Sequence, residues 1–281
     1  MRVHVDAANG EWGKVVVHGD DLRDPAGFLL SFGSATIPLR AIDGRDDAVA
    51  LGDSDEPLFV FDGDSAAFRR VPRWRRILAN FLMMRVLRLR SEFLFFHAAS
   101  VGIRNAGVML VGPKGTGKST LSLALAARGH AFYGDEMAVY NPIDGMLLPF
   151  RRPVGIKPGP RASAIESALS RTTATPDEEG MLRIPVTDVL DIADVIPQAL
   201  RTVIFLKGFG PSAAMQKIEA GRDELASMQP IATSMQDGTK ASHVFQMIRL
   251  LSHCQCYHLT AGGPDETAAL VERQLELAQA P

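Results

Sequence analysis

Short apolar runs separated by glycines fill the first part of the chain. Val15–Val17, Phe28–Leu30, Ala35–Leu39 and Leu58–Phe61 are apolar or alternating, and glycines recur between them. Runs of this length bounded by turn residues are typical of β-strands. The pattern therefore predicts a β-rich N-terminal part over residues 1–68.

The pattern then changes to a helical one with many arginines. Ile77, Phe81 and Met84 recur at near-helical spacing, which predicts a helix over 69–91 with one face on a core. Arginines surround this apolar stripe: Arg69, Arg70, Arg73, Arg75, Arg76, Arg85, Arg88 and Arg90. They either form a solvated helix face or bind an acidic partner.

From residue 92 onward, strands and helices alternate. Apolar runs predict strands at 93–96, 99–103 and 107–111, with the last two paired across a turn at 104–107. Further helices are expected over 120–127, 161–171, 240–252 and 264–279, and further strands over 131–133, 201–206 and 256–260. This order predicts an α/β domain over 92–281.

A glycine-rich loop joins the strand at 107–111 to the helix at 120–127. Its sequence is Gly112-Pro113-Lys114-Gly115-Thr116-Gly117-Lys118-Ser119, which fits G-x-x-x-x-G-K-[ST] at every fixed position. Glycines let backbone N–H groups turn toward a phosphate, and the helix N-terminus adds partial positive charge. Lys118 can reach the β- and γ-phosphates, and the Ser119 hydroxyl can ligate Mg²⁺. The alternative is a chance glycine turn before a helix.

Two adjacent carboxylates, Asp135 and Glu136, end the strand that follows this helix. A strand–loop–helix–strand unit should bring them beside the phosphate loop. One could then ligate a metal and the other could accept a substrate proton. An exposed acidic turn is the alternative.

A basic segment rich in proline and glycine runs from Arg151 to Pro160 and contains Lys157. It either closes over the phosphates or is a stiff solvated connection. With Lys157 included, the predicted nucleotide-binding residues are Gly112, Pro113, Lys114, Gly115, Thr116, Gly117, Lys118, Ser119, Thr120 and Lys157.

The composition of the chain limits the classes of partner that it is expected to bind. The chain has 281 residues and a net charge of −2, so it offers no overall attraction for nucleic acid or an anionic membrane. No apolar run approaches the ~20 residues that a membrane span needs. Cys254 and Cys256 are the two cysteines, and we expect both to be reduced in a cytoplasmic protein.

With these segments in view, the chain resembles the catalytic domain of HPr kinase/phosphorylase and its kinase relatives. The residues that carry the resemblance are His97-Ala98-Ala99-Ser100, the loop Gly112 to Ser119, and Arg128-Gly129-His130 followed by Asp135-Glu136. The spacing between the loop and the acid pair matches without gaps. The resemblance covers residues 92–160 well and the remainder in outline.

The resemblance implies an ATP-dependent serine kinase whose fold is similar to that of phosphoenolpyruvate carboxykinase. Lys118 would hold the β- and γ-phosphates, and Ser119 would ligate Mg²⁺. Asp135 would take the serine proton and also lie near the metal. Glu136 would help to hold the metal, and His97 would assist Asp135.

The chain departs from the family pattern in two places. The second acid is Glu136 where the family has Asp, and the Glu-Ile-Arg-Gly-Leu-Gly signature linked to the reverse phosphorolysis is absent, with Pro153 to Gly159 standing near its place. Kinases of peptide-modifying gene clusters, which phosphorylate a serine of a precursor peptide, are more similar to this chain.

Three functions stay open on the residues alone. The leading one is a serine kinase that uses ATP and Mg²⁺ on a protein or peptide, without nucleic acid or membrane partners and with a homo-oligomer left open. The second is a small-molecule kinase or nucleotide hydrolase. The third is a non-catalytic nucleotide-binding regulatory module, against which the acid pair argues, because binding ATP needs no base.

Overall fold

The chain divides into two units, residues 1–89 and 90–281. The structure, a computed structural model, describes residues 3–6, 12–17, 39–42, 45–51, 59–62, 65–69, 92–151, 154–173, 176, 181–184, 186–191, 195–232 and 241–278. Each unit is described by itself.

The first unit contains a six-stranded sheet in the order β1-β2-β6-β5-β4-β3, and each neighbouring pair in it is antiparallel. Its strands are β1 (Val3–Asp6), β2 (Trp12–Val17), β3 (Leu39–Ile42), β4 (Arg45–Leu51), β5 (Phe59–Asp62) and β6 (Ser65–Arg69). β2 and β5 coincide with two of the predicted apolar runs. The run Phe28–Leu30 lies outside the described residues.

The predicted basic helix falls almost wholly outside the described residues, which resume at residue 92. Its first position needs correction. Arg69 is the last residue of β6 and pairs with Trp12 of β2, so it extends a strand where a helix was expected.

The second unit is built on a mixed nine-stranded sheet. The main path runs β10-β8-β9-β15-β12-β11-β7, while β17 also pairs with β15, and β16 with β17. Its strands are β7 (Leu94–Phe96), β8 (Ala99–Ile103), β9 (Ala106–Val111), β10 (Ala131–Gly134), β11 (Ala138–Tyr140), β12 (Met146–Leu148), β15 (Gln198–Phe209), β16 (Ala214–Ile218) and β17 (Gln255–Ala261). β9, β15 and β17 are mutually parallel and lie at its centre.

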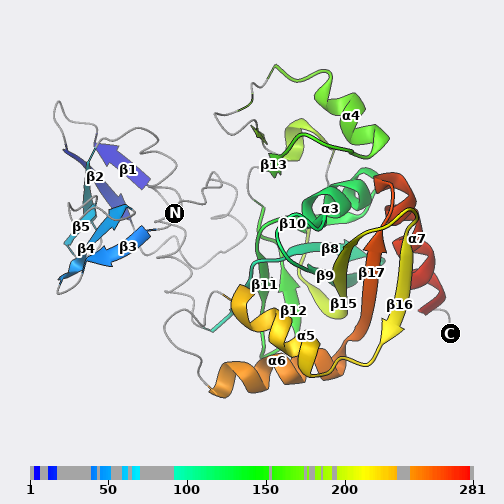
Figure 1. Cartoon of the computed structure of the whole chain (residues 1–281). Coiled ribbons are helices and arrows are strands. Elements are labelled where there is room, and N and C mark those ends of the chain that lie inside the picture. Colours follow the sequence, from blue (N-terminus) through cyan, green and yellow to red (C-terminus); the bar gives the residue numbers. More distant parts are fainter. Residues whose placement is uncertain are drawn as a thin grey trace. The chain divides into compact units, whose positions relative to one another are not determined.

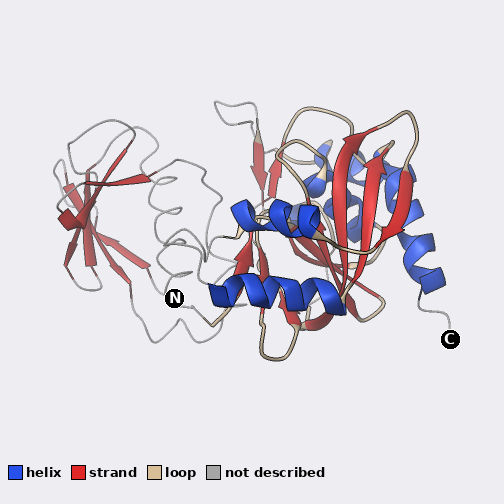
Figure 2. Ribbon diagram, turned by 60° about the horizontal axis from the view of Figure 1, so that its bottom comes forward, coloured by secondary structure: helices blue, strands red, loops and turns tan. Residues whose placement is uncertain are grey.

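Helices cover both faces of this sheet, as Figures 1 and 2 show. α3 (Lys118–Ala127), α4 (Ser163–Leu169) and α7 (Pro264–Ala278) lie on one face, and α5 (Arg222–Met228) and α6 (Ala241–His253) lie on the other. Alternate residues of one strand serve the two cores. Val108 and Leu110 of β9 pack with α3 and α7, while Met109 packs with α6.

The remaining elements are short. β13 (Val154–Ile156) pairs with β14 (Leu182–Ile184) as a separate two-stranded sheet near α4. Two 3₁₀ turns, η2 (Val186–Asp188) and η3 (Gln229–Ile231), complete the described elements. β13 gives the basic proline- and glycine-rich segment a strand, which the sequence analysis had treated as a loop or a connection.

The α/β fold class is confirmed, with the glycine loop between β9 and α3. Predicted pairing of β8 with β9 is also confirmed: the turn between them holds Arg104 and Asn105 at φ of 49° and 65°. This double left-handed turn suits the twist of a hairpin. Among the described residues, no helix is long and apolar enough to cross a bilayer.

Candidate functional site

The loop between β9 and α3 depends on its glycines. Gly115 and Gly117 have φ of 89° and 92°, in the region where a β-carbon is unfavourable. Gly112 is held by close packing, because a β-carbon there would lie 2.8 Å from Thr116 Oγ1 and 2.9 Å from the Leu206 carbonyl oxygen. Thr116 Oγ1 donates to the Pro113 carbonyl at 2.9 Å and closes the turn. The loop is therefore shaped before any ligand arrives.

Lys118 begins α3 and folds back under the loop. Its Nζ donates to the carbonyl oxygens of Gly112, at 2.7 Å, and Pro113, at 2.9 Å. An ammonium group has three donors, so one is left for a further acceptor. The residue is only 7 % exposed. Burial, and secondarily the charge of Lys157, lower the pKa of Lys118 below its ordinary 10.5. A phosphate beside it would reverse that shift.

Lys157 follows β13 and lies close enough to Lys118 to act on its pKa. This lysine is one of the nucleotide-binding residues predicted from the sequence, on a segment that either closes over the phosphates or is a solvated connection. The Lys157 carbonyl accepts a hydrogen bond from Arg161 Nη2 at 2.9 Å, which ties the segment together. Lys118 and Lys157 thus concentrate positive charge at the start of α3, where the helix dipole is also positive.

The acid pair reaches the loop by a different route from the one expected. β10 does not pair with β9, because β8 runs between them and is antiparallel to both. Two strand spacings, about 10 Å, therefore separate the ends of β9 and β10. The prediction that the strand after α3 ends directly beside the loop is therefore corrected, because β8 separates the two strands. β9 and β10 still end at the same edge of the sheet, on either side of the start of β8.

His97 stands just before β8 at that edge. Ala99, the first residue of β8, pairs with Leu110 near the end of β9, so His97 lies two residues before this point. Ser100 pairs with Gly134, the last residue of β10, so Asp135 follows directly after the strand end beside the start of β8. The His97 N–H donates to the Ile231 carbonyl at 2.7 Å, and the residue is exposed. The topology thus brings the segments of His97, Asp135 and the phosphate loop to one edge.

The acids differ in environment. Asp135 is only 4 % exposed, while Glu136 is half-buried. With Ser119, they are the oxygen donors at this edge that suit Mg²⁺, which keeps several water and phosphate ligands beside one or two from the protein. The described residues contain no group of three or more His, Cys, Asp or Glu side chains that could hold a metal on their own.

The Arg128-Gly129-His130 segment faces α7. Arg128 Nε donates to Glu272 Oε2 at 2.7 Å, and His130 Nε2 lies 2.7 Å from Glu272 Oε1. Gly129, at φ of 92°, ends α3 and lets the chain turn into β10. The two side chains join the end of α3 to the last helix, which is a structural role.

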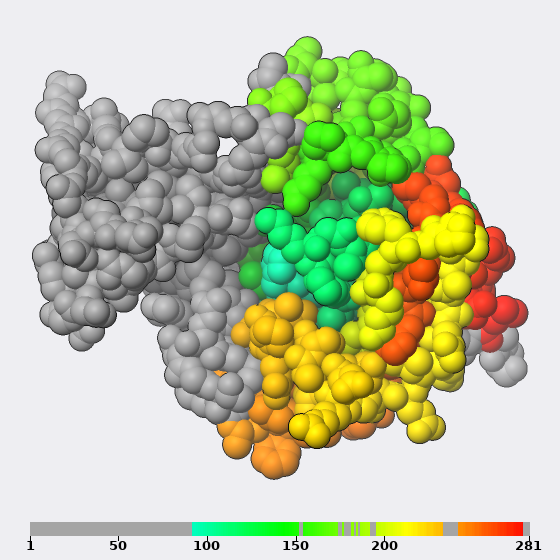
Figure 3. All heavy atoms as spheres, in the orientation of Figure 1, coloured from blue at the N-terminus to red at the C-terminus, as the bar shows by residue number. Residues whose placement is uncertain are grey.

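Phe209 is a residue that the sequence analysis did not single out. It is the last residue of β15, and it is 66 % exposed. A β-carbon built on Gly117 would lie 3.3 Å from Phe209 Cζ, so the ring lies beside the phosphate loop. In Figure 3, the yellow segment around the β15–β16 turn lies next to the teal-green segment that follows β9. An aromatic residue between Gly208 and Gly210, directly after a buried strand, was the available signal.

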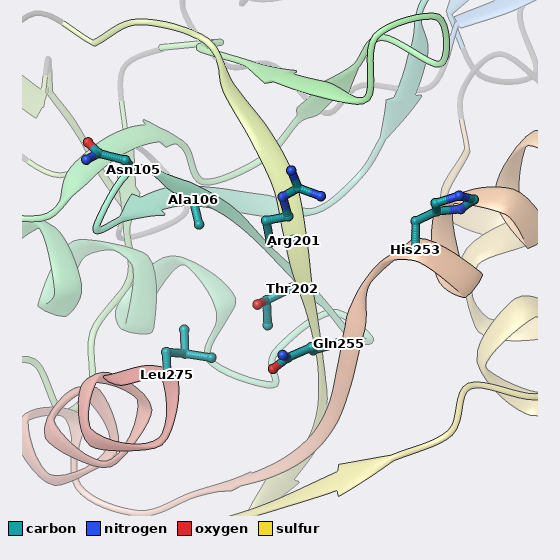
Figure 4. Close-up of a pocket in the computed structure, with 7 residues that line it drawn as sticks. All are labelled: Asn105, Ala106, Arg201, Thr202, His253, Gln255 and Leu275. Carbon is teal, nitrogen blue, oxygen red and sulfur yellow. The ribbon is translucent and has the colours of Figure 1, made fainter. Parts of the chain in front are cut away.

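A pocket of about 360 Å³ lies at the opposite edge of the sheet, shown in Figure 4. It is lined by the first residues of β9 and β17 and by Leu275 of α7. Arg201 and Thr202 also line it, but they leave β15 toward different sides, so their polar groups do not converge. The pocket is separate from the phosphate loop, which follows the last residue of β9.

Both cysteines carry free thiols, as expected. Cys256 is buried and Cys254 half-buried, and burial raises their pKa values to about 11 and about 12. Thiols held in this protonated form are poor nucleophiles and metal ligands.

Comparison with known proteins points to one group of enzymes. No family model matches the chain. Relatives described as HPr kinase/phosphorylase come from Prosthecochloris aestuarii (41 % identical over 51 residues), Aromatoleum aromaticum (26 % over 120) and Chlorobium phaeobacteroides (37 % over 65). These matches cover 18 %, 41 % and 23 % of this chain and 15 %, 38 % and 18 % of the relatives. The chain therefore matches well under half of each relative's length.

A solved structure of the Hpr(Ser) kinase/phosphatase from Coxiella burnetii also matches, at 15 % identity and a TM-score of 0.30, over 66 % of this chain and 95 % of that one. A score this low carries no weight for function. The relatives in sequence do confirm that the chain resembles HPr kinases.

Proposed function

We propose that this protein is an ATP- and Mg²⁺-dependent kinase that transfers the γ-phosphoryl group to a serine of a protein or precursor peptide. The observation that supports this most is the sheet edge where the phosphate loop, His97 and Asp135 converge. Nucleotide binding alone would need the loop and its lysine. A buried carboxylate at the same edge is needed when a hydroxyl proton must be removed.

The loop and two lysines would bind the phosphates. Lys118 keeps one donor after its bonds to Gly112 and Pro113, and Lys157 adds a second charge nearby. Backbone N–H groups at the start of α3 complete the cradle. These groups are fixed in place before the transfer, so they stabilise charge on the phosphoryl group without reorganising.

The acids would serve the metal and the acceptor. Ser119, Asp135 and Glu136 are the residues that would hold Mg²⁺, which supplies neutralisation of the phosphate charge when bound. In the transfer, the serine oxygen bonds to the γ-phosphorus, the bond from that phosphorus to the β,γ-bridging oxygen breaks, and the hydroxyl proton passes to the Asp135 carboxylate. ADP and phosphoserine are the products. His97 would orient Asp135.

A polypeptide acceptor is favoured because the relatives are described as HPr kinase/phosphorylase, a name that gives the protein HPr as their substrate. We extend to this chain only the serine acceptor on a polypeptide.

The test is single-turnover phosphoryl transfer from γ-labelled ATP to HPr and to a panel of serine peptides. Asp135→Asn keeps the shape of the side chain and loses its charge. We expect it to bind Mg·ATP and to lower the transfer rate by about 10²- to 10⁴-fold, the usual contribution of a general base. Lys118→Ala should weaken ATP binding about 10- to 100-fold, as expected for a lost charged hydrogen bond.

Matched controls are Asp191→Asn and Lys217→Ala, which change exposed residues that have no part in the proposed binding or transfer. Both should bind ATP and transfer phosphate as the unchanged protein does. Transfer at the full rate by Asp135→Asn would remove Asp135 from the mechanism. Loss of ATP binding in that variant would make it a metal ligand first and would pass the role of base to Glu136. Label appearing only as free phosphate would indicate a nucleotide hydrolase.

A further inference from the structure

Phe209 stands out among the exposed apolar residues because of its neighbour. It is 66 % exposed, although it ends a strand whose residues Thr202 to Leu206 are buried. Atoms Cζ and Cε1 of its ring approach Gly117, at 3.3 and 3.4 Å from the position of a β-carbon there. Only the ring's edge is used in this contact, and most of its surface remains free.

An irregularity in β15 sets the direction of this ring. Strict alternation from Phe205, which packs with the α5–α6 core, would place Phe209 on that same face. The register with β17 shifts between Leu206 and Gly208, and Gly208 has φ of +128°. A shift of one residue reverses the side on which later side chains emerge. Phe209 accordingly meets Gly117 at the start of α3.

The backbone after Phe209 is firmly held. The Gly210 N–H donates to the Ala261 carbonyl at 2.8 Å. The Ala213 N–H donates to Glu266 Oε1 of α7 at 2.9 Å. The exposed ring is therefore presented on a fixed turn, and its exposure is a property of a rigid part of the fold.

We infer that Phe209 is a stacking platform for the base of the bound nucleotide. This rests on the proposed nucleotide site, because the loop that Gly117 belongs to would hold the phosphates while the base extends beyond it. An aromatic face favours any purine or pyrimidine ring by stacking, without hydrogen bonds to particular base edges. Phe209 would thus raise the affinity for nucleoside triphosphates in general and would not choose between adenine and guanine.

The test compares ligands with and without a base in the full chain. Binding of Mg·ATP, Mg·GTP and inorganic tripolyphosphate is measured by calorimetry for the unchanged protein and for Phe209→Ala. We expect the variant to lose about 5- to 150-fold in affinity for ATP, and a similar factor for GTP, with tripolyphosphate unchanged. Phe209→Trp should retain the affinity for both nucleotides, because it keeps an aromatic face.

Phe245→Ala is the matched control, since Phe245 is 69 % exposed on α6, on the other face of the sheet. It should bind all three ligands as the unchanged protein does. Equal losses for ATP and tripolyphosphate in Phe209→Ala would mean that the ring only supports the loop, and would overturn the inference. Unchanged ATP affinity would also overturn it, and a raised KM for the acceptor would then place the ring in the acceptor site. If the unchanged protein binds neither ATP nor tripolyphosphate, the proposed nucleotide site itself fails.

Discussion

At the scale of single residues, Lys118 is the group whose chemistry the fold alters most directly at the candidate site. A lysine in water is fully protonated near neutral pH, and burial opposes that charge. The carbonyls of Gly112 and Pro113 offset part of the cost by accepting two hydrogen bonds. The nearby positive charge of Lys157 further disfavours the protonated form of Lys118. The free protein therefore holds a lysine whose charge is less favourable than usual.

This state predicts that nucleotide binding at alkaline pH takes up a proton. Phosphate charge beside Lys118 raises its pKa from the lowered value of the free protein, so between those two values the complex binds more protons than the free protein does. Affinity for ATP should accordingly fall as the pH rises toward the ordinary lysine value of 10.5. Calorimetry in two buffers of different ionisation enthalpy measures the uptake.

Lys157→Gln provides the comparison for this measurement. Removing the neighbouring charge brings the pKa of Lys118 in the free protein closer to its ordinary value, so the uptake should shrink. No proton uptake in the unchanged protein would contradict the assignment of Lys118 to the phosphates. An identical uptake in the variant would show that Lys157 does not act on the pKa of Lys118.

At the scale of elements, α7 holds its neighbours through its acidic residues. Asp265 accepts two hydrogen bonds from Ser163, through N–H and Oγ, at the start of α4. Glu266 accepts from Ala213 in the β15–β16 turn, and Glu276 pairs with Arg104 in the β8–β9 turn. The Glu272 carboxylate forms hydrogen bonds with both Arg128 and His130. One helix thus fastens four separate parts of the domain.

Glu272 should contribute most among these carboxylates to stability. Burial alone would raise its pKa, but the hydrogen bonds and charges of Arg128 and His130 outweigh burial and hold its pKa below the ordinary 4.5. A lowered folded-state pKa means that this stabilisation is present above about pH 4.5 and is lost as the pH falls through the folded value. Glu272→Gln should lower the free energy of unfolding in urea at neutral pH by about 1–2 kcal/mol. This is the usual contribution of a hydrogen bond between charged groups, reduced because Arg128 is partly exposed to solvent.

Glu276→Gln is the natural counterpart, because Glu276 and Arg104 are about half exposed. Its effect should stay within about 0.5 kcal/mol, as for most surface ion pairs. Equal effects of the two substitutions would show that the contacts of Glu272 contribute no more to the free energy of unfolding than a surface ion pair does. The difference between Glu272→Gln and the unchanged protein should also shrink in acid, since both forms are then neutral at this position.

Sequence reasoning succeeded where an element's neighbours lie close along the chain. The β9–loop–α3–β10 segment, the β8–β9 hairpin and the bounds of α6, β17 and α7 follow from local periodicity and turn residues. The placement of β8 between β9 and β10 did not follow, because a register between strands depends on the packing of the whole sheet. The partner of Arg128 and His130 lay 144 and 142 positions away, beyond any local pattern.

The candidate site shows the same division. The loop residues and the acid pair carry a recognisable spacing, from which the sequence predicts them as site residues, and their roles stay predictions. Phe209 carried no motif, and its position depends on a shift of register beside Gly208. Lys157 is predicted from a basic segment that could close over the phosphates, and the path of β13 brings it near Lys118.

At the scale of the whole molecule, the second unit contains its own core. Both apolar clusters, on the two faces of the nine-stranded sheet, consist of residues from Leu94 onward within the described chain. Every residue of the candidate site also lies in this unit. A domain with its own core can fold alone.

A fragment of residues 90–281 should therefore fold and bind Mg·ATP with an affinity within about threefold of that of the full chain, a difference below 1 kcal/mol. Circular dichroism during thermal unfolding and calorimetry check the two parts of this expectation. A fragment that folds cooperatively but binds ATP much more weakly would show that residues before 90 contribute to the nucleotide site. Failure of the fragment to fold would show that residues 90–281 need the rest of the chain for their stability.

The contacts of α7 also bear on how the chain reaches its folded state. Its acidic residues join partners that lie 53, 102, 142 and 172 positions away along the chain. Contacts across such separations form only after long stretches of chain have been ordered, since the entropy of closing those loops must be met first. The hairpin of β8 and β9 and the α3 crossover need no such closure and can form early. We therefore expect α7 to dock late in folding, and its docking would fix the start of α4, the end of α3 and two exposed turns together.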